Sequence, residues 1–192
     1  MFTGLWCENM ADVPKGLESL MRHAGSADKA LPPVHSWNPP HCGDIGLRID
    51  REGRWFYQNS PITRAPLVRL FSRILRKDPD GYVLVTPVEK VSIAVEDAPF
   101  LAVELIREGE GENQRLALRT STDEWVEVGP DHPLRFEAGE DGFKPYVLVR
   151  GELWALLSRA LAYDLVDLVV ERGSSTGLWS NAIFFPLSHQ DS

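Results

Sequence analysis

The sequence predicts an α+β fold built from a duplicated unit of antiparallel strands plus one amphipathic helix. Three observations support this class. Short segments with alternating apolar residues, separated by Gly, Pro and Asp, fill most of the chain. Helical spacing of apolar residues is clearest in one window, 64–75. A second window, 150–161, repeats six of the twelve residues of the first.

The first unit begins with a predicted hairpin and continues into a helix. Strands at 45–49 and 54–58 flank the turn 50–53, where a glycine can adopt the positive φ of such loops. The helix is predicted over 64–76, with Thr63 as its N-cap and Pro66 in its first turn. The break at 78–81 is expected to end it.

The other elements are predicted from the same periodicities. Leucine and methionine spacing indicates a short helix at 14–24 and a long helix at 152–171. A proline-rich arm over 30–41 is expected to lie on the surface. Further strands are predicted at 82–86, 91–96, 100–107, 116–120, 125–128, 133–137, 146–149 and 178–185.

The two helical windows define the proposed repeat. Aligned, they share Ser72-Arg73 and Ser158-Arg159 on the polar side, where leucine spacing alone requires no match. The YVLV tetrapeptides at 82–85 and 146–149 fall at a different shift, so we treat them as coincidence. The predicted divisions are 1–32 (N-terminal helix and arm), 33–100 (first strand-helix repeat) and 101–192 (second strand-helix repeat).

Composition bounds the class of protein. The chain has 192 residues, of which 43% are hydrophobic and 25% charged, typical of a globular protein. Its apolar runs are too short for membrane insertion. Two cysteines cannot build a disulfide framework, and no basic-then-apolar leader opens the sequence, so we expect a cytoplasmic protein.

The net charge of −8 argues against nucleic acid as a partner, because a phosphate backbone rewards clustered Lys and Arg. The segment 48–77 is nevertheless basic, with eight Lys and Arg against two acidic residues. It could attract an anionic ligand or dock the first half on the acidic second half. We favour docking.

No residue set forms a recognisable reaction centre. Neighbouring His41 and Cys42 point to opposite sides of an extended chain, which argues against a nucleophile and its base. Spacings typical of metal sites and nucleotide loops do not occur, so we predict no metal and no cofactor. The carboxylates that could serve as a general base are Asp44, Glu89 and Asp97.

Binding residues are predicted around the two repeats. Trp55 and Tyr57 could form an aromatic wall beside the cation of Arg48, although one face of an alternating strand is more often core. Arg64 and Arg150 open the two predicted helices, where a cation opposes the helix dipole and so could reach a bound anion. Glu89 completes the candidate set.

A long series of motifs runs from Pro33 to Leu187. Its members are Trp37-Asn38-Pro39, Cys42-Gly43-Asp44-Ile45, Gly53-x-Trp55-x-Tyr57, Ser60-Pro61-Ile62-x-Arg64, Leu70-Phe71, Leu84–Lys90, Val95–Phe100, Pro145-Tyr146-Val147, Trp179-Ser180 and Phe185-Pro186-Leu187. The resemblance that this series carries is to a bacterial family known as domain of unknown function 1285. It implies a duplicated α+β core whose second half is superficially pleckstrin-homology-like, with a binding site between the halves. Asn59 departs from the glycine expected before Ser60.

The sequence therefore predicts a non-enzymatic cytoplasmic binding module, in signal transduction, that holds a small anionic ligand or a peptide in a groove between its halves. The alternative is a small hydrolase or lyase that uses one of the three carboxylates as a base. A homo-oligomer, or a subunit whose groove is filled by a partner, is also compatible with the sequence.

Overall fold

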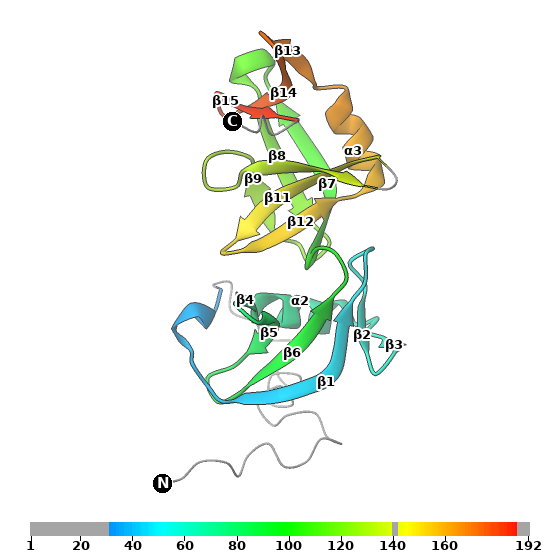
Figure 1. The fold of residues 1–192 in the computed structure, drawn as a ribbon, viewed down its shortest axis with the longest axis vertical. Coiled ribbons are helices and arrows are strands. Elements are labelled where there is room, and N and C mark those ends of the chain that lie inside the picture. Colours follow the sequence, from blue (N-terminus) through cyan, green and yellow to red (C-terminus); the bar gives the residue numbers. More distant parts are fainter. Residues whose placement is uncertain (1–30, 140–141, 188–192) are drawn as a thin grey trace. The chain divides into compact units, whose positions relative to one another are not determined.

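The computed structural model describes residues 31–139 and 142–187, so the helix predicted at 14–24 lies outside them. The chain forms two compact units, Met1–Asp97 (the first unit) and Ala98–Ser192 (the second unit). In residues 31–139 and 142–187, each unit shows one curled six-stranded sheet and one α-helix (Figure 1). Strands dominate, and the α+β class holds in this coarse form. The pleckstrin-homology-like second half stays a prediction.

The first unit places its sheet around a central parallel pair. Strand order is β3-β2-β1-β6-β5-β4, and β1 and β6 run parallel while every other neighbouring pair is antiparallel. The elements are η1 (Val34–Ser36), β1 (His41–Ile49), β2 (Trp55–Tyr57), β3 (Ser60–Pro61), α2 (Ala65–Arg73), β4 (Leu75–Asp78), β5 (Gly81–Val85) and β6 (Lys90–Val95).

Helix α2 packs the apolar face that its spacing predicts. Leu67 and Phe71 are buried, and the Phe71 ring lies 6.0 Å from that of Trp55 on β2. The predicted end of this helix is wrong: the chain leaves it at Arg73, and 75–78 forms β4. Leu75 continues the helical spacing but pairs with Leu84 instead, because a ladder hydrogen bond and full burial are gained there. The N-cap is Arg64, not Thr63.

The described part of the second unit contains a six-stranded sheet, a small three-stranded sheet, the α-helix α3 and the short 3-10 helix η2. The large sheet has the order β10-β11-β12-β7-β8-β9, and the small one β13-β14-β15. The elements are β7 (Phe100–Glu108), η2 (Gly111–Asn113), β8 (Arg115–Thr120), β9 (Trp125–Glu127), β10 (Leu134–Gly139), β11 (Gly142–Arg150), β12 (Leu153–Leu157), α3 (Arg159–Val166), β13 (Val170–Arg172), β14 (Ser175–Ser180) and β15 (Ile183–Pro186).

The buried hydroxyl of Ser180 ties the small sheet to the large one. It accepts a hydrogen bond from the backbone N–H of Leu116 (3.1 Å) and donates to the carbonyl of Val128 (2.7 Å). The single strand predicted over 178–185 is two strands, because Asn181 and Ala182 take positive φ and turn the chain back. A turn of this kind suits right-twisted hairpins.

The long helix predicted at 152–171 is wrong. Residues 153–157 form β12, which pairs in parallel with β7, and only Arg159–Val166 is helical. The leucines of this segment satisfy both periods, and the alternating burial of Leu153, Ala155 and Leu157 shows which one the fold uses. The hydroxyl of Ser158, as N-cap, accepts from the N–H of Leu161 (3.5 Å).

The two sheets share one strand order, so the chain is duplicated. The alignment of the two copies differs from the one that the helical windows suggested. Read from β9, the second sheet has the order β9-β8-β7-β12-β11-β10, so each strand of the first sheet recurs six strands later. The helices are not equivalent, since α2 precedes β4 whereas α3 follows β12. Accordingly Arg64 begins a helix while Arg150 ends a strand.

The YVLV tetrapeptides occupy equivalent strands, β5 and β11, so treating them as coincidence was wrong. Their tyrosines also have equivalent neighbours. Tyr82 pairs with Lys77 on β4, whose ammonium lies 4.1 Å from the ring centroid. Tyr146 pairs with Arg135 on β10, whose guanidinium lies 4.9 Å from its ring. The same cation–aromatic pair therefore marks the same position of both sheets.

Candidate functional site

Two of the predicted binding residues of the first unit are engaged in its sheet. The Arg48 guanidinium pairs with the Glu96 carboxylate (2.6 Å) and lies 4.2 Å from the Phe56 ring centroid. Trp55 is 2% exposed and belongs to the core, so it cannot act as a wall for a ligand. Side chains alternate between the two faces of a sheet, so Trp55, which pairs with Ile49, lies on the face opposite to Arg48.

The remaining predicted residues are scattered. Tyr57 is half-buried beside the Gln58 amide (3.2 Å), and Arg64 is exposed at the start of α2. Glu89 is buried in the turn between β5 and β6, where its N–H donates to the Thr86 hydroxyl (3.1 Å). Arg150 forms a close ion pair with Glu124 and lies 5.0 Å from the Phe100 ring.

The three carboxylates proposed as bases lie at different places: Asp44 on β1, Glu89 in the turn before β6, and Asp97, half-buried, after β6. Asp44 is exposed on β1, where the pairing with β6 is irregular, and it accepts a hydrogen bond from the N–H of Gly46 (2.7 Å). Among residues 31–139 and 142–187, no group of three His, Cys, Asp or Glu side chains is arranged to hold a metal ion. The same residues include no helix of the length and apolarity needed to cross a membrane.

Two carboxylates that the sequence analysis did not single out accept several hydrogen bonds each within the first unit. Asp50 accepts from the N–H groups of Glu52 (3.0 Å) and Arg54 (2.9 Å), and from Nε of Arg54 (2.7 Å). Burial raises the pKa of Asp50, but these hydrogen bonds outweigh it and leave the pKa below its usual value. The signal was available, because Asp at the start of a turn commonly bonds the backbone ahead of it.

Asp78 is the second missed carboxylate. Arg76 binds both of its oxygens (2.6 and 3.0 Å), and Nζ of Lys90 reaches one of them (2.9 Å). The hydrogen bonds from Arg76 are the main cause that lowers the pKa of Asp78 to about 2, against the opposing effect of burial. Arg76 also donates to the carbonyls of Val34 and Trp37, which fixes the proline-rich arm.

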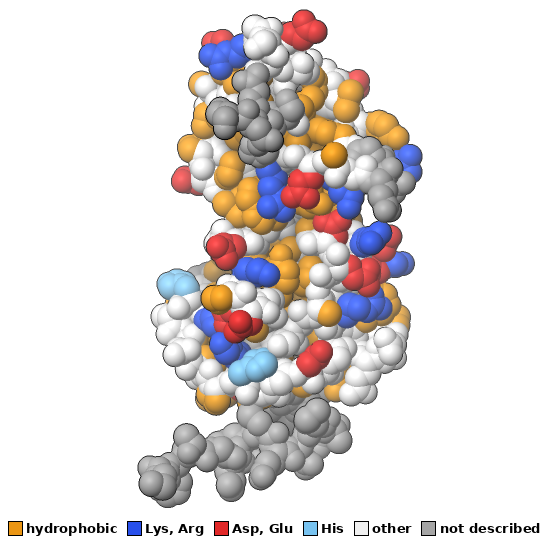
Figure 2. Space-filling model, in the orientation of Figure 1, with side chains coloured by type: hydrophobic (Ala, Val, Ile, Leu, Met, Phe, Trp, Pro, Cys, Tyr) orange, Lys and Arg blue, Asp and Glu red, His pale blue; other side chains and the backbone are white. Residues whose placement is uncertain are grey.

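Ion pairing of this kind is widespread. In the view of Figure 2, Lys and Arg side chains lie next to Asp and Glu side chains. Of the four predicted binding residues that are charged, Arg48 and Arg150 are neutralised by a carboxylate in the same unit. Their charge is therefore already compensated, which weakens the case for an anion clamp.

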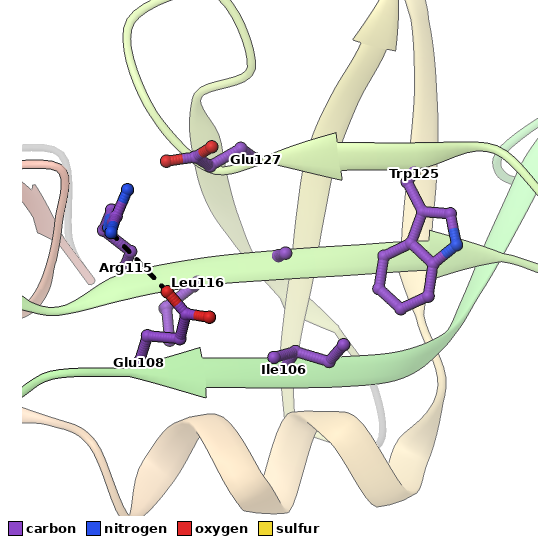
Figure 3. A pocket seen from close by; sticks show the side chains of 7 residues that line it. Ile106, Glu108, Arg115, Leu116, Trp125 and Glu127 are labelled. Carbon is purple, nitrogen blue, oxygen red and sulfur yellow. Dashed lines mark ion pairs between the residues drawn. The ribbon is translucent and has the colours of Figure 1, made fainter.

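A different feature stands out on the second unit: a hollow of about 250 Å³ on the outward side of β7, β8 and β9 (Figure 3). We call this surface the β7–β9 face. In the ladder, Ala117 lies opposite Ile106 on one side and Glu127 on the other. Because alanine is small, the centre of the face is recessed. The outward residues of the face are Glu104, Ile106, Glu108, Arg115, Ala117, Arg119, Trp125 and Glu127.

The walls of the hollow are apolar and its rim is charged. Ile106 is 44% exposed and Trp125 48% exposed, large fractions for such side chains. On the rim, Arg115 pairs with Glu108 (3.6 Å), and Arg119 pairs with Glu104 (2.6 Å) and Asp123 (3.0 Å). The hollow is smaller than pockets that hold whole cofactors or drug-sized ligands, but it has room for a single large side chain.

These are the features of a protein class: a mostly β, two-unit protein with a repeated sheet topology. Family models match both units, the N-terminal domain of the DUF1285 family over residues 32–98 and its C-terminal domain over residues 99–187. The chain belongs to the DUF1285 family, whose description is a domain of unknown function, as the sequence motifs predicted.

Two solved structures of bacterial DUF1285 proteins are similar. The one from Silicibacter pomeroyi DSS-3 is 45% identical with a TM-score of 0.82, over 88% of this chain and 93% of its own. The one from Shewanella baltica OS155 is 31% identical with a TM-score of 0.51, over 64% of this chain and 91% of its own. No curated protein matches.

Proposed function

We propose that this protein is a non-enzymatic binding module that holds a segment of another polypeptide on the β7–β9 face. The observation that carries this proposal is the hollow over Ala117, walled by the exposed side chains of Ile106 and Trp125. Exposed Trp side chains next to a recess are typical anchors of polypeptide interfaces.

Between the two ligand classes predicted from the sequence, these contacts favour the peptide. A small anion needs unpaired cations, whereas Arg115 and Arg119 on this face are both paired with carboxylates. An apolar side chain needs a recess that excludes water, which the walls of the hollow supply. The paired charges on the rim remain hydrated and disfavour non-specific apolar contacts.

Other parts of the sequence-based hypothesis stay predictions. They are the cytoplasmic location, the role in signal transduction, the possible homo-oligomer and the groove between the halves. The alternative enzymatic function, with Asp44, Glu89 or Asp97 as a base, also stays a prediction.

Binding to a peptide library tests the proposal. The full chain is used to select from a random seven-residue library displayed on phage, and the strongest peptide is labelled with fluorescein for anisotropy titrations. Ala117→Phe, which fills the hollow, should abolish binding. Trp125→Ala should weaken it at least tenfold. Tyr163→Ala is the matched control, because Tyr163 is an exposed aromatic residue on α3 and its removal should leave affinity unchanged.

Equal affinity of the selected peptide for the natural chain and for Ala117→Phe would show that the hollow is not the binding site. Circular dichroism and amide NMR spectra of each variant establish that the sheet is intact. A peptide that loses affinity for Tyr163→Ala instead would move the site to α3 and overturn the proposal.

A further inference from the structure

Strand β9 is one edge of the six-stranded sheet, and its backbone is open to a further strand. The backbone N–H of Thr120 donates to the carbonyl of Glu124, and the backbone N–H of Val128 donates to the carbonyl of Leu116. These bonds fix the alternation of the β8–β9 ladder, in which Arg119 with Trp125 and Ala117 with Glu127 are the non-hydrogen-bonded pairs. The N–H and C=O groups of Trp125 and Glu127 therefore point away from β8, and nothing in 31–139 or 142–187 hydrogen-bonds to them.

The equivalent edge of the first unit is protected. Strand β3, which corresponds to β9, consists of Ser60 and Pro61, and proline lacks the N–H that a further strand would need. The N–H of the next residue, Ile62, donates back to the carbonyl of Trp55 (2.7 Å). The two copies of the same topology thus differ at this edge, and the open edge is the one beside the hollow (Figure 3).

The side chains of β9 specify what a further strand should carry. In an added antiparallel strand, the residues opposite Trp125 and Glu127 place their side chains on the β7–β9 face. The Glu127 carboxylate accepts from the Asn181 amide (2.9 Å), and no Lys or Arg pairs with it among the described residues. A basic residue opposite Glu127 and an apolar residue opposite Trp125 complement this edge.

A second copy of this chain fits the edge less well. Two β9 strands paired antiparallel about Val126 would set each Trp125 opposite a Glu127, and neither carboxylate would gain a cation. The charge at the edge therefore favours a different polypeptide over self-association.

We infer that the partner binds by strand addition: an extended segment joins the sheet antiparallel to β9 and carries an apolar residue two positions from a basic one. This inference rests on the proposed function, because the apolar side chain lies next to Trp125 at the wall of the hollow. The strand is short, so four backbone hydrogen bonds and these two side chains together supply the affinity and the sequence preference.

Peptide backbone methylation tests strand addition separately from the hollow. In the labelled library peptide, the residues opposite Trp125 and Glu127 use their own N–H groups toward β9, while the N–H of the residue between them points away. N-methylation of the apolar or the basic residue should weaken binding at least tenfold. N-methylation of the middle residue should change it less than twofold.

A matched pair of variants tests the same bonds from the protein side. Glu127→Pro removes the outward N–H together with the charge, whereas Glu127→Ala removes only the charge. We expect Glu127→Pro to bind the peptide at least tenfold more weakly than Glu127→Ala. If Glu127→Pro fails to fold, the methylated peptides still decide the outcome.

The outcomes separate the two proposals. If Ala117→Phe weakens peptide binding but N-methylation and Glu127→Pro do not, strand addition is overturned and the proposed function stands. If Ala117→Phe leaves the affinity unchanged, both proposals are overturned. Sedimentation that shows a dimer of the natural chain, and a monomer for Glu127→Pro, identifies a second copy as the occupant and also overturns this inference.

Discussion

Replacement of Asp78 by Asn should destabilise the first unit in a pH-dependent way. The Asp78 carboxylate is mostly buried at the end of β4, where it accepts two hydrogen bonds from Arg76 and one from Lys90. Asparagine keeps the shape of the side chain but removes the charge that both cations face. It also weakens the hold of Arg76, which anchors the arm at Val34 and Trp37.

The magnitude follows from the pKa of Asp78. A fall from 3.8 to about 2 means that the folded state favours the ionised carboxylate, which corresponds to about 2 kcal/mol at about 1.4 kcal/mol per pKa unit. Because the pKa is lowered on folding, this stability is present in full above the unfolded value of 3.8 and is lost as the pH falls through 2. The natural chain and Asp78→Asn should therefore differ at pH 7 and converge toward pH 2.

Urea unfolding followed by amide NMR signals of the first unit measures this difference, because the signals separate that unit from the second. Asp80→Asn is the control. Asp80 is exposed in the adjacent turn, and its replacement should change the free energy of unfolding by less than about 0.5 kcal/mol. A difference between the natural chain and Asp78→Asn that stays constant from pH 7 to pH 3, or that is absent at pH 7, would refute the reasoning.

Substitutions at three further positions test the fold by urea unfolding. Trp55→Ala removes a core side chain and should cost about 3–5 kcal/mol in the first unit, without changing peptide affinity at the β7–β9 face; an affinity loss in the folded variant would contradict this. Asn59→Val should cost about 1–2 kcal/mol because Asn59 has a φ of 66°, whereas Asn59→Gly should be nearly neutral. Ser180→Ala leaves the N–H of Leu116 without its partner and should cost roughly 1–3 kcal/mol in the second unit. The control is Ser174→Ala at an exposed position, and an equal effect of both would argue against the role of Ser180.

Local patterns predicted much of the first unit. The β1–β2 hairpin and the buried face of α2 follow from alternation and from leucine spacing, and both are confirmed. The positive φ of Asn59 explains how this chain departs from glycine there, since asparagine tolerates the left-handed region. These features depend on residues close in sequence.

Features that depend on distant pairing were not predictable. Leu153 and Leu157 fit a helix as well as a strand, and only the parallel pairing with β7 decides between them. The hollow exists because the β7–β8–β9 register sets Ala117 between Ile106 and Glu127, and a sequence does not give its register. Trp125 was visible in the sequence, but the sequence does not show whether its side chain faces solvent or the core.

The equivalence of β5 and β11 shows that a short sequence match can mark equivalent positions of a structural repeat. Duplication is confirmed for the sheets, but the two helices that carry the stronger sequence match are not structurally equivalent, whereas the strands that carry the four-residue match are. Amphipathic helices resemble one another by necessity, whereas a strand at the same place in two sheets keeps its tyrosine and the cation across from it.

An amide and methyl NMR titration of the full chain with the selected peptide tests the central claim most directly. We predict that the largest shifts fall on the Ala117 methyl group, on Ile106, and on the Trp125 indole and the Glu127 amide. Shifts confined to the first unit, at residues such as Arg48 and Arg64, would contradict the assignment of polypeptide binding to the β7–β9 face.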